Sequence, residues 1–503
     1  MAASGASSAG KRHRCPLRVT TPEVNRLSAR RAVLAKTRFL GYQWSVPLRT
    51  AAIILAVIAH AALAVERPPV GEGRATGSAT SAVTLAGPPG VVHAKDRAFV
   101  DEDGPFLGLG TTLFWGLWGY EHDRDRLGRN LAAASYAGFD YIRVLGIVGP
   151  GDGWRDRTVD PRDSQWADRV AEFTDWAYDR YGLRVQWTVF GGVDTTPTAE
   201  SRATAVERLA RALEGRQYKV FAVEVANEGW QNGFGGNDGR QELKRLAARL
   251  RSRYQGLLAT TAPRSIDCEA QAAMNSGSPA TFATLHFPRV EHQWTVLEDA
   301  WRSGQLSCAG VPDAYANNEP IGPYSSGRDD RDPLRLAMAA AVSWMSGVGA
   351  YVLHTGPGIR GGGAEDRRER RPANIWETEN WGATTAALEC VRFTLPPDLP
   401  AWTRRRGDAR DHPFETRAAS GRRAAVGQHP AAVNGRRFVM LLPDISRAAD
   451  LVARRPMDVR VVHPQTCSTL AHRRLDRGDA LRLATDPRAA IVVGQWTAGQ
   501  ASP

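Results

Sequence analysis

Two glutamates in this chain each follow an asparagine at the end of an apolar, strand-like run. Asn227 and Glu228 lie in "FAVEVANEGW", and Asn318 and Glu319 lie in "YANNEPIGP". Two carboxyl groups in one site suit cleavage of a glycosidic bond, because one must be protonated to release the leaving oxygen and the other must be ionised to attack the anomeric carbon. Burial and a neighbouring carboxylate raise the pKa of one, while hydrogen-bond donors keep the pKa of the other low.

The sequence around these pairs predicts the elements that position them. Short apolar runs alternate with longer amphipathic ones, which is typical of repeated strand–helix units and a parallel sheet. A hairpin with its turn at Asp103–Gly104 is expected first. Eight strands are expected at 106–114, 141–147, 184–190, 220–227, 256–262, 281–287, 313–318 and 350–355. Helices are expected at 123–139, 164–182, 199–217, 240–256 and 333–349, with shorter ones at 268–276 and 295–304.

Eight such units predict an α/β fold, a (β/α)8 TIM barrel over residues 91–398. Barrels of this kind place their chemistry at the carboxyl ends of the strands. Glu228 ends the fourth expected strand and Glu319 ends the seventh, so both should open onto the same mouth.

Other residues at the strand ends suit the binding of a sugar. Arg143, at the end of the second strand, is a candidate donor to the ionised glutamate, and the amides of Asn227 and Asn318 suit sugar hydroxyls. His286 and His354 end the sixth and eighth strands, where the alternative is a hydrogen bond inside the core. Flat apolar faces of sugars stack on aromatic rings, although a single ring is more often ordinary packing. The aromatic residues that follow strand ends are Trp115, Trp118, Trp230 and Tyr324.

An Asn-Glu pair on strand 4 and a glutamate on strand 7 of a (β/α)8 barrel resemble the cellulase-like clan of retaining glycoside hydrolases, which includes cellulases and mannanases. The likeness covers roughly residues 90–395. It implies that Glu228 is the general acid/base, that Glu319 is the nucleophile in double displacement on a β-linked glycan, and that Asn227 contacts the sugar 2-hydroxyl. These implied roles depend on the strand count, and a miscounted strand would exchange them. The chain departs from these relatives at Gly229, Pro288 and His354, where they commonly have proline, tyrosine and an aromatic ring. The sugar, the linkage and endo or exo action stay open.

Alternatives remain for several features. Glu224 is interpreted as a buried structural glutamate paired with a lysine or arginine rather than a third catalytic acid. The glycine-rich stretch 356–371 lacks a phosphate-loop motif, so a mobile loop over the mouth is expected. No cofactor is expected, and metal-ligand spacing is not evident, which makes a metal-dependent hydrolase the weakest option. The competing class is a glycan-binding barrel without turnover.

The formal charge of +12 is concentrated at the two ends of the chain. Residues 1–64 hold ten Lys or Arg and one acid, and residues 401–503 hold eighteen Arg and nine acids. The main domain is therefore net acidic, which argues against a nucleic-acid partner. Residues 1–64 are interpreted as a basic extension with a signal peptide ending near Ala64, followed by a linker at 65–90. The protein is then expected to be secreted or periplasmic without a stable membrane anchor.

Export permits disulfides, and the chain beyond Cys15 keeps four cysteines. Of the three possible pairings, Cys268 with Cys308 is the most economical, while four free thiols are nearly as plausible. In residues 399–503, apolar and polar residues alternate over short runs separated by turns, which predicts an antiparallel β-sandwich. Structural support is favoured over glycan binding for this domain, and the oligomeric state is open. Strands are expected at 423–428, 436–443, 457–464, 480–485 and 489–496.

Overall fold

The computed structural model of this protein describes most of the chain from residue 87 onward. The described residues are 87–151, 155–287, 289, 297, 301, 304, 306–405, 409–418, 429–443, 449–483 and 488–497. The expected signal peptide and most of the expected linker lie outside these residues, as do most of the expected helix at 295–304 and the expected strand at 423–428. Among the described helices, none has the length and hydropathy needed to cross a membrane.

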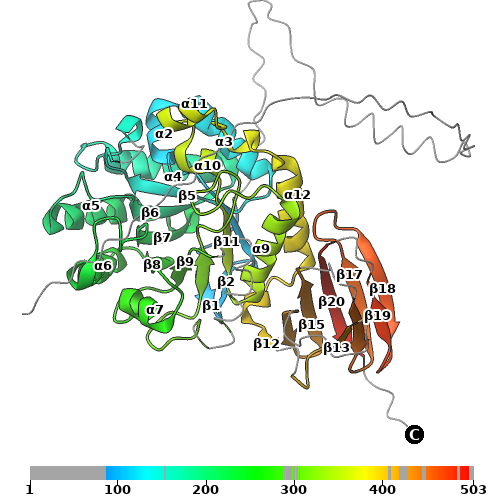
Figure 1. Ribbon diagram of the computed structural model, residues 1–503. Coiled ribbons are helices and arrows are strands. Elements are labelled where there is room, and N and C mark those ends of the chain that lie inside the picture. The colour runs from blue at the N-terminus through cyan, green and yellow to red at the C-terminus, as the bar shows by residue number, and fades with distance from the viewer. Residues whose placement is uncertain are drawn as a thin grey trace, which may run out of the picture. The chain divides into compact units, whose positions relative to one another are not determined.

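Eight parallel strands form the main sheet, in the order β8-β7-β6-β5-β4-β11-β10-β9. Backbone hydrogen bonds from Thr281 and Phe282 to the Leu258 carbonyl bring the two outer strands together, so the sheet closes into a barrel (Figure 1). The TIM barrel is therefore confirmed, and so is the strand count, since β7 is the fourth barrel strand and β10 the seventh. The strands are β4 (Gly108–Thr112), β5 (Tyr141–Ile147), β6 (Arg184–Phe190), β7 (Val220–Ala226), β8 (Leu258–Thr261), β9 (Ala283–Leu285), β10 (Tyr315–Asn317) and β11 (Ala350–Leu353).

Helices surround this barrel and connect successive strands. Several begin where a side chain accepts a hydrogen bond from the helix's own first turn, as Thr198, Asp267 and Asp332 do. The glycine-rich stretch expected as a mobile loop instead contains two short helices, α10 (Gly356–Arg360) and α11 (Ala364–Glu369). The other described helices of the barrel are α2 (Gly116–His122), α3 (Arg124–Tyr136), α4 (Trp166–Tyr181), α5 (Ala199–Ala212), α6 (Gly236–Arg251), α7 (Cys268–Asn275), α9 (Pro333–Met345) and α12 (Trp381–Thr394).

A small antiparallel sheet closes the amino end of the barrel. It comprises β1 (His93–Lys95), β2 (Ala98–Asp101) and β3 (Gly104–Phe106), with the expected turn between β2 and β3. Phe99 is fully buried and meets the rings of Phe221 and Phe282 edge-on. Beside it, the buried Arg184 donates hydrogen bonds to the carbonyls of residues 88–90. Within the described residues, this small sheet and its buried aromatic rings therefore cover the amino end of the barrel interior.

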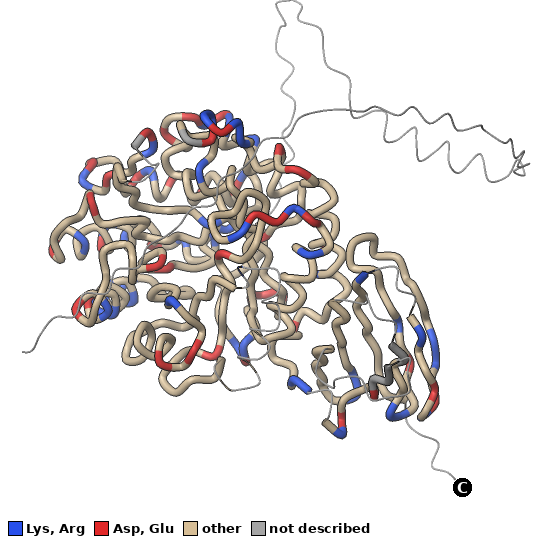
Figure 2. The backbone as a smooth tube through the Cα atoms, viewed as in Figure 1, with Lys and Arg blue, Asp and Glu red and all other residues tan. Residues whose placement is uncertain are grey.

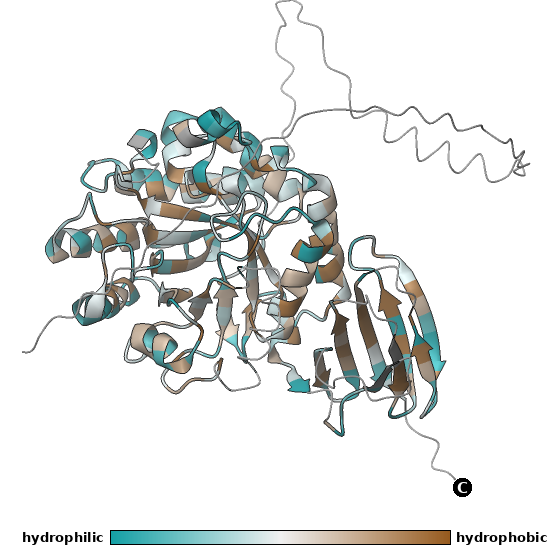
Figure 3. Ribbon diagram, in the orientation of Figure 1, coloured by the Kyte–Doolittle hydropathy of each residue, from teal (hydrophilic) through white to brown (hydrophobic). Residues whose placement is uncertain are grey.

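The expected β-sandwich follows the barrel, as two antiparallel sheets whose inner strands are strongly hydrophobic (Figure 3). One sheet has the order β12-β14-β15-β20-β17-β18, and the other has the order β13-β16-β19. Their strands are β12 (Thr403–Arg405), β13 (Phe414–Ala418), β14 (Ala431–Asn434), β15 (Arg437–Leu442), β16 (Ala449–Ala453), β17 (Met457–Val462), β18 (Thr469–Leu475), β19 (Ala480–Arg482) and β20 (Ala490–Trp496).

The sandwich and the barrel share apolar packing and a covalent bridge. Leu441 and Ile491 belong to the same buried apolar cluster as Leu336 of α9. Cys390 of α12 forms a disulfide with Cys467, which lies between β17 and β18. The expected Cys268–Cys308 disulfide is confirmed as well.

Strand β18 is an edge of the larger sheet, and it carries the arginine pair Arg473-Arg474. Both side chains are exposed, as is His472 beside them. Figure 2 shows Lys and Arg positions along this outer strand. Both arginines are therefore accessible to solvent at this edge of the sheet.

Candidate active site

Glu228 and Glu319 both lie just beyond the carboxyl end of a barrel strand. Strand β7 ends at Ala226, and Glu228 follows in a turn with a positive φ of 40°, a region that residues other than glycine seldom adopt. The turn is held by the Gly229 N–H, which donates to Thr261 Oγ1 at 2.8 Å. Strand β10 ends at Asn317, two residues before Glu319. The two carboxylates therefore open onto the same mouth.

The carboxylates also approach each other closely. One oxygen of Glu228, one oxygen of Glu319 and a ring nitrogen of His286 all lie within 4.8 Å of one another. All three side chains are buried. The spatial relation on which the sequence hypothesis depends is therefore present.

Arg143 holds Glu319 from inside the barrel. Its Nη1 donates to Glu319 Oε1 at 2.8 Å, and its Nη2 donates to Asn227 Oδ1 at 2.8 Å. Arg143 is fully buried, and its guanidinium lies 5.0 Å from the ring centroid of Phe114. Burial acts to lower the pKa of Arg143, but the charges of Glu224 and Glu319 outweigh it and raise that pKa. Arg143 is thus a permanent cation beside Glu319, as expected.

Glu224 has the structural role that the sequence favoured. Arg143 Nη2 donates to its Oε2 at 2.8 Å, and Thr188 Oγ1 donates to the same oxygen at 3.0 Å. Thr284 Oγ1 donates to Oε1 at 2.7 Å, and the side chain is fully buried. Glu224 is therefore occupied in orienting Arg143 from below and does not reach the mouth.

The oxygens of the two glutamates that do not contact Arg143 meet another arginine, Arg289. Its Nη2 lies 2.8 Å from Glu319 Oε2 and 3.0 Å from Glu228 Oε1. It also lies 2.8 Å from His286 Nδ1, which is itself 3.0 Å from Glu228 Oε1. The second oxygen of Glu228 accepts a hydrogen bond from Gln231. Each carboxylate thus has one oxygen fixed by its own neighbour and one oxygen bound to the shared guanidinium.

The electrostatic surroundings lower the pKa of both glutamates. For Glu319, burial alone would raise the pKa, but His286 and the guanidinium groups of Arg143 and Arg289 hold it far below its usual range. For Glu228, burial and the negative charge of Glu319 raise the pKa, while the hydrogen bond from His286 and the charge of Arg289 bring it below normal. Glu319 is consequently the more strongly ionised of the two.

His354 is part of the core beneath the site. It is fully buried, and its Nδ1 lies 2.8 Å from Thr112 Oγ1 while its Nε2 lies 3.1 Å from Ser326 Oγ. Burial lowers its pKa to about 3, so the ring is neutral. Its Nε2 is 3.8 Å from Glu319 Oε2. His354 therefore supports Glu319 from behind, and its contact with a sugar stays a prediction.

The two asparagines lie beside the glutamates as expected. Asn227 is half-buried, and because its Oδ1 accepts from Arg143, its NH2 group is the part that can reach a ligand. Asn318 is fully buried, and its Nδ2 donates to Glu224 Oε2 at 3.3 Å. Asn318 thus faces the barrel interior, where it contributes to the network below the mouth.

The four aromatic residues expected to stack on a sugar differ from one another in how far their rings are buried. Trp115 is buried, and its Nε1 donates to the Pro357 carbonyl at 3.0 Å, so the expectation of an open stacking surface is wrong for this ring. Trp118 is half-buried and packs against the same core. Trp230, which follows Glu228, and Tyr324, in the loop after β10, are also half-buried and have guanidinium groups near their rings, Arg264 at 5.6 Å and Arg331 at 4.0 Å.

Glu228, His286 and Glu319 are the one group of potential metal ligands found among the described residues. Carboxylates and an imidazole at this spacing could hold a divalent cation. Arg289 Nη2, however, lies within 3.0 Å of one donor atom of each residue. A metal ion would have to displace this guanidinium, so the donors are already neutralised by the chain itself.

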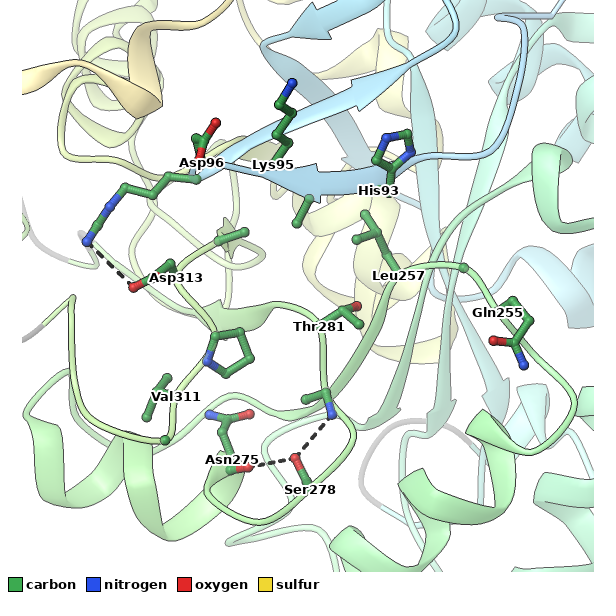
Figure 4. A pocket seen from close by; sticks show the side chains of 17 residues that line it. His93, Lys95, Asp96, Gln255, Leu257, Asn275, Ser278, Thr281, Val311 and Asp313 are labelled. Atoms are coloured by element: carbon green, nitrogen blue, oxygen red, sulfur yellow. Dashed lines mark hydrogen bonds and ion pairs between the residues drawn. The ribbon is translucent and has the colours of Figure 1, made fainter.

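A separate pocket of about 580 Å³ lies at the opposite end of the barrel. Its lining includes Leu257, Thr281 and Ala314, which precede β8, β9 and β10, and residues of the β1–β2 hairpin such as Lys95 (Figure 4). Because these residues come before the strands, the pocket is remote from the two glutamates. It has no part in the chemistry considered below.

Neither a family model nor a curated protein matches this chain in sequence. Among solved structures, it is similar to a GH30 endoxylanase from Clostridium papyrosolvens, with 12% identity over 78% of this chain and 97% of that one and a TM-score of 0.43. It is also similar to a GH27 β-L-arabinopyranosidase from Geobacillus stearothermophilus (11% identity, 79% and 98% covered, TM-score 0.44). A third is an exo-β-1,4-mannosidase from an Opitutaceae bacterium (14% identity, TM-score 0.40).

The chain covers 54% of that mannosidase, which in turn covers 52% of this chain. All three TM-scores lie below 0.5, so function is argued below from the side chains of this chain. The feature on which the sequence resemblance rests, an Asn-Glu pair after the fourth strand and a glutamate after the seventh, is present at one mouth.

Proposed function

We propose that this protein is a retaining glycosidase that cleaves a β-linked glycan by double displacement. The observation that carries the proposal is the approach of one Glu228 oxygen to one Glu319 oxygen within 4.8 Å over the barrel mouth. Carboxyl groups about 5–5.5 Å apart favour retention, whereas about 6.5–9.5 Å leaves room for the water of an inverting enzyme. The close approach therefore favours direct attack by one carboxylate.

Glu319 is the proposed nucleophile. Its low pKa keeps it ionised, and the bond from Arg143 to Oε1 fixes the carboxylate plane so that Oε2 faces the other glutamate. Attack of Oε2 on the anomeric carbon forms a glycosyl ester and breaks the bond to the leaving oxygen. Positioning by a rigid, permanently charged partner lowers the entropic cost of this step.

Glu228 is the proposed general acid and then the base. In the free protein its pKa is held down by His286 and Arg289, against burial and the charge of Glu319. A sugar that displaces Arg289 removes one of these cations, which raises the pKa of Glu228 towards that of an acid catalyst. Once Glu319 is esterified its charge is gone, so the pKa of Glu228 falls again and suits removal of a proton from water.

Further side chains would hold the sugar. The NH2 group of Asn227, whose Oδ1 accepts from Arg143, would bind a hydroxyl neighbouring the anomeric carbon, in the role that the resemblance implies for the 2-hydroxyl. Trp230 and Tyr324 are the half-buried rings near the mouth that can cover an apolar sugar face. Export of the protein is proposed from the apolar run ending near Ala64, and it is supported by the two disulfides of the described chain.

The proposal is tested with Glu228→Gln and Glu319→Gln on a panel of aryl β-glycosides and polysaccharides. Each variant should lose at least about 10²–10⁴-fold of turnover, the usual contribution of such a group. Glu269→Gln, which changes an exposed glutamate of α7, is the matched control and should stay near the wild-type rate. NMR should show the β-anomer as the first product, and a 2-deoxy-2-fluoro glycoside should label Glu319. Full activity in either site variant removes that residue from the mechanism.

The second candidate is a glycan-binding barrel without turnover, and the position of Arg289 between the two glutamates is the observation that favours it. Titration calorimetry that detects glycan binding, with no reducing ends released by the wild type, would select this candidate. Hydrolysis that depends on Glu319 would exclude it.

A further inference from the structure

Arg289 occupies the space where the reacting atoms of a substrate have to lie. Glu319 Oε1 is taken by Arg143 and Glu228 Oε2 by Gln231, which leaves Glu319 Oε2 and Glu228 Oε1 for chemistry. These are the two oxygens that bind Arg289 Nη2, at 2.8 and 3.0 Å. A sugar ring and a guanidinium cannot both be between them, so substrate binding requires Arg289 to turn away.

Displacement of Arg289 by an uncharged sugar is unfavourable. Two charge-assisted hydrogen bonds in a buried site are broken, and an uncharged ring returns no counter-charge to the arginine. A substrate that carries its own anionic group offers the displaced guanidinium a new partner. The exchange then replaces one ion pair with another.

The stem of Arg289 keeps the displaced head at the mouth. A Cβ placed on Gly327, in the loop after β10, would lie 3.3 Å from Arg289 Cγ, so the stem packs against this loop. The side chain is 31% exposed, which gives the head room to turn towards solvent. Its Nε is buried and has no hydrogen-bond partner in the described part of the chain. The guanidinium therefore has an unused donor on the edge that a two-oxygen anion would approach.

A second arginine lies on the same side of the mouth. Arg264 follows β8, the strand beside β9, and its guanidinium lies 5.6 Å from the ring centroid of Trp230. The side chain is exposed, and within the described residues no carboxylate pairs with it. The loops after β8 and β9 thus present two cations, Arg289 at Glu228 and Arg264 at Trp230, although the main domain as a whole is net acidic.

We infer that the substrate is an anionic glycan, with a carboxylate or sulfate ester on the sugar that binds beside Glu228 and Glu319, and that Arg289 receives this group. The inference rests on the proposed glycosidase function. The planar fork of arginine matches the two oxygens of either anion, which a lysine ammonium cannot do. Arg289 is then a specificity-determining residue, and Arg264 contributes charge further out.

The experiment compares each acidic glycan with its own uncharged form. Aryl β-uronides and β-linked acidic polysaccharides are paired with their carboxyl-reduced products, and sulfated substrates with their desulfated products. The wild type should prefer the charged member by at least about tenfold in kcat/KM, and added salt should reduce the preference. A preference within the uronate pairs alone identifies a carboxylate, and one within the sulfate pairs alone identifies a sulfate ester.

Arg289→Gln should remove most of this preference, chiefly through a raised KM for the charged substrates, while Arg289→Lys should restore part of it. Arg253→Gln is the matched control, because it removes an exposed arginine beyond α6 that pairs with Glu214, and it should leave the preference unchanged. A general structural defect would lower turnover of both members alike, and that result would overturn the inference. Faster turnover of uncharged substrates by the wild type would also overturn it.

Binding gives a readout that does not depend on catalysis. Titration calorimetry with Glu228→Gln should show tighter binding of the acidic glycan than of its reduced form, and Glu228→Gln with Arg289→Gln should show equal binding. If the wild type cleaves nothing while this difference is found, the proposed hydrolysis fails and anion recognition stands. If the wild type hydrolyses the glycans but both members of a pair bind with equal affinity, the glycosidase proposal stands and anion recognition by Arg289 fails.

Discussion

Arg143 gives the two glutamates different environments. It donates to Glu319 and Glu224 at 2.8 Å, whereas Glu228 receives its bonds from Gln231, His286 and Arg289. His286 and Arg289 lower the pKa of both glutamates, but Glu319 has the fixed cation Arg143 in addition, so its pKa stays low when a substrate displaces Arg289. Two residues of one type can thus perform different steps.

The pH dependence of kcat/KM should reflect these shifts. Activity needs Glu319 ionised and Glu228 protonated in the free protein, and the pKa of each is lowered. The optimum should therefore lie on the acidic side, with activity lost as rising pH deprotonates Glu228. Arg289→Gln removes a cation that lowers the pKa of Glu228, so its alkaline limb should move to higher pH. The measurement is the full pH profile of kcat/KM for the variant on its best substrate. An unchanged alkaline limb would show that Arg289 does not influence the pKa of Glu228.

Glu224→Gln should destabilise the protein and reduce activity together. The change leaves the buried Arg143 without one of its two carboxylates, and breaking a buried pair costs about 3–5 kcal/mol. Thr284→Val is the comparison, because it removes one hydrogen bond to Glu224 at nearly constant volume and should cost about 1–3 kcal/mol. Urea unfolding measures both. A Glu224→Gln variant as stable as the wild type would show that Arg143 is satisfied without this partner.

At the scale of elements, the barrel strands could be predicted because each is a short apolar run followed by an amphipathic one. The helix α12 could not, because it follows a glycine-rich stretch whose two short helices carry no periodic apolar pattern. Strand β18, "TLAHRRL", was also missed, since an edge strand with exposed charges lacks alternation.

The site, like the elements, could be predicted from the sequence only in part. Residues directly at strand ends, such as Glu228 and Arg143, point to the mouth by topology alone. Arg289 lies three residues beyond His286, where the strand has ended and the direction of a side chain depends on the local backbone. Its one signal in the sequence was a charged residue between "HFP" and an apolar position. The enclosure of Trp115 was equally hidden, because burial of that ring depends on Pro357, far along the chain.

The lengths of the loops that the two disulfides close predict how much each bridge contributes to the free energy of unfolding. Cys268–Cys308 closes a loop of 40 residues and Cys390–Cys467 a loop of 77. On the chain-entropy model, replacing both cysteines of a bridge by serine should cost about 4 kcal/mol, slightly more for the longer loop. Equilibrium unfolding of the two double variants measures this. A loss below about 1 kcal/mol in either would mean that its bridge hardly restricts the unfolded chain.

At the scale of the whole molecule, the barrel and the sandwich are joined by core residues as well as by a disulfide. Leu441 and Ile491 lie in the cluster that contains the barrel helices, while Val461 lies in the separate core of the sandwich. Arg404 also donates to the Met345 carbonyl at 2.9 Å. The sandwich thus packs beside α9, and its supporting role stays a prediction.

The two domains should therefore unfold in one cooperative transition. Leu441→Ala should cost about 2–5 kcal/mol and lower the midpoint of that single transition. Val461→Ala, inside the sandwich alone, should lower the same midpoint. Calorimetry with a parallel assay of activity measures this. Two separate transitions, with activity lost only in one, would show that the domains are energetically independent.

The exposed arginines of β18 have one more consequence. An outer strand with free backbone donors and acceptors is a template on which a neighbouring molecule could add its own strand. A second copy approaching β18 would bring Arg473 and Arg474 against their own counterparts, and this repulsion opposes growth of the sheet from molecule to molecule. We therefore expect Arg473 and Arg474 to oppose fibrous self-association through this edge.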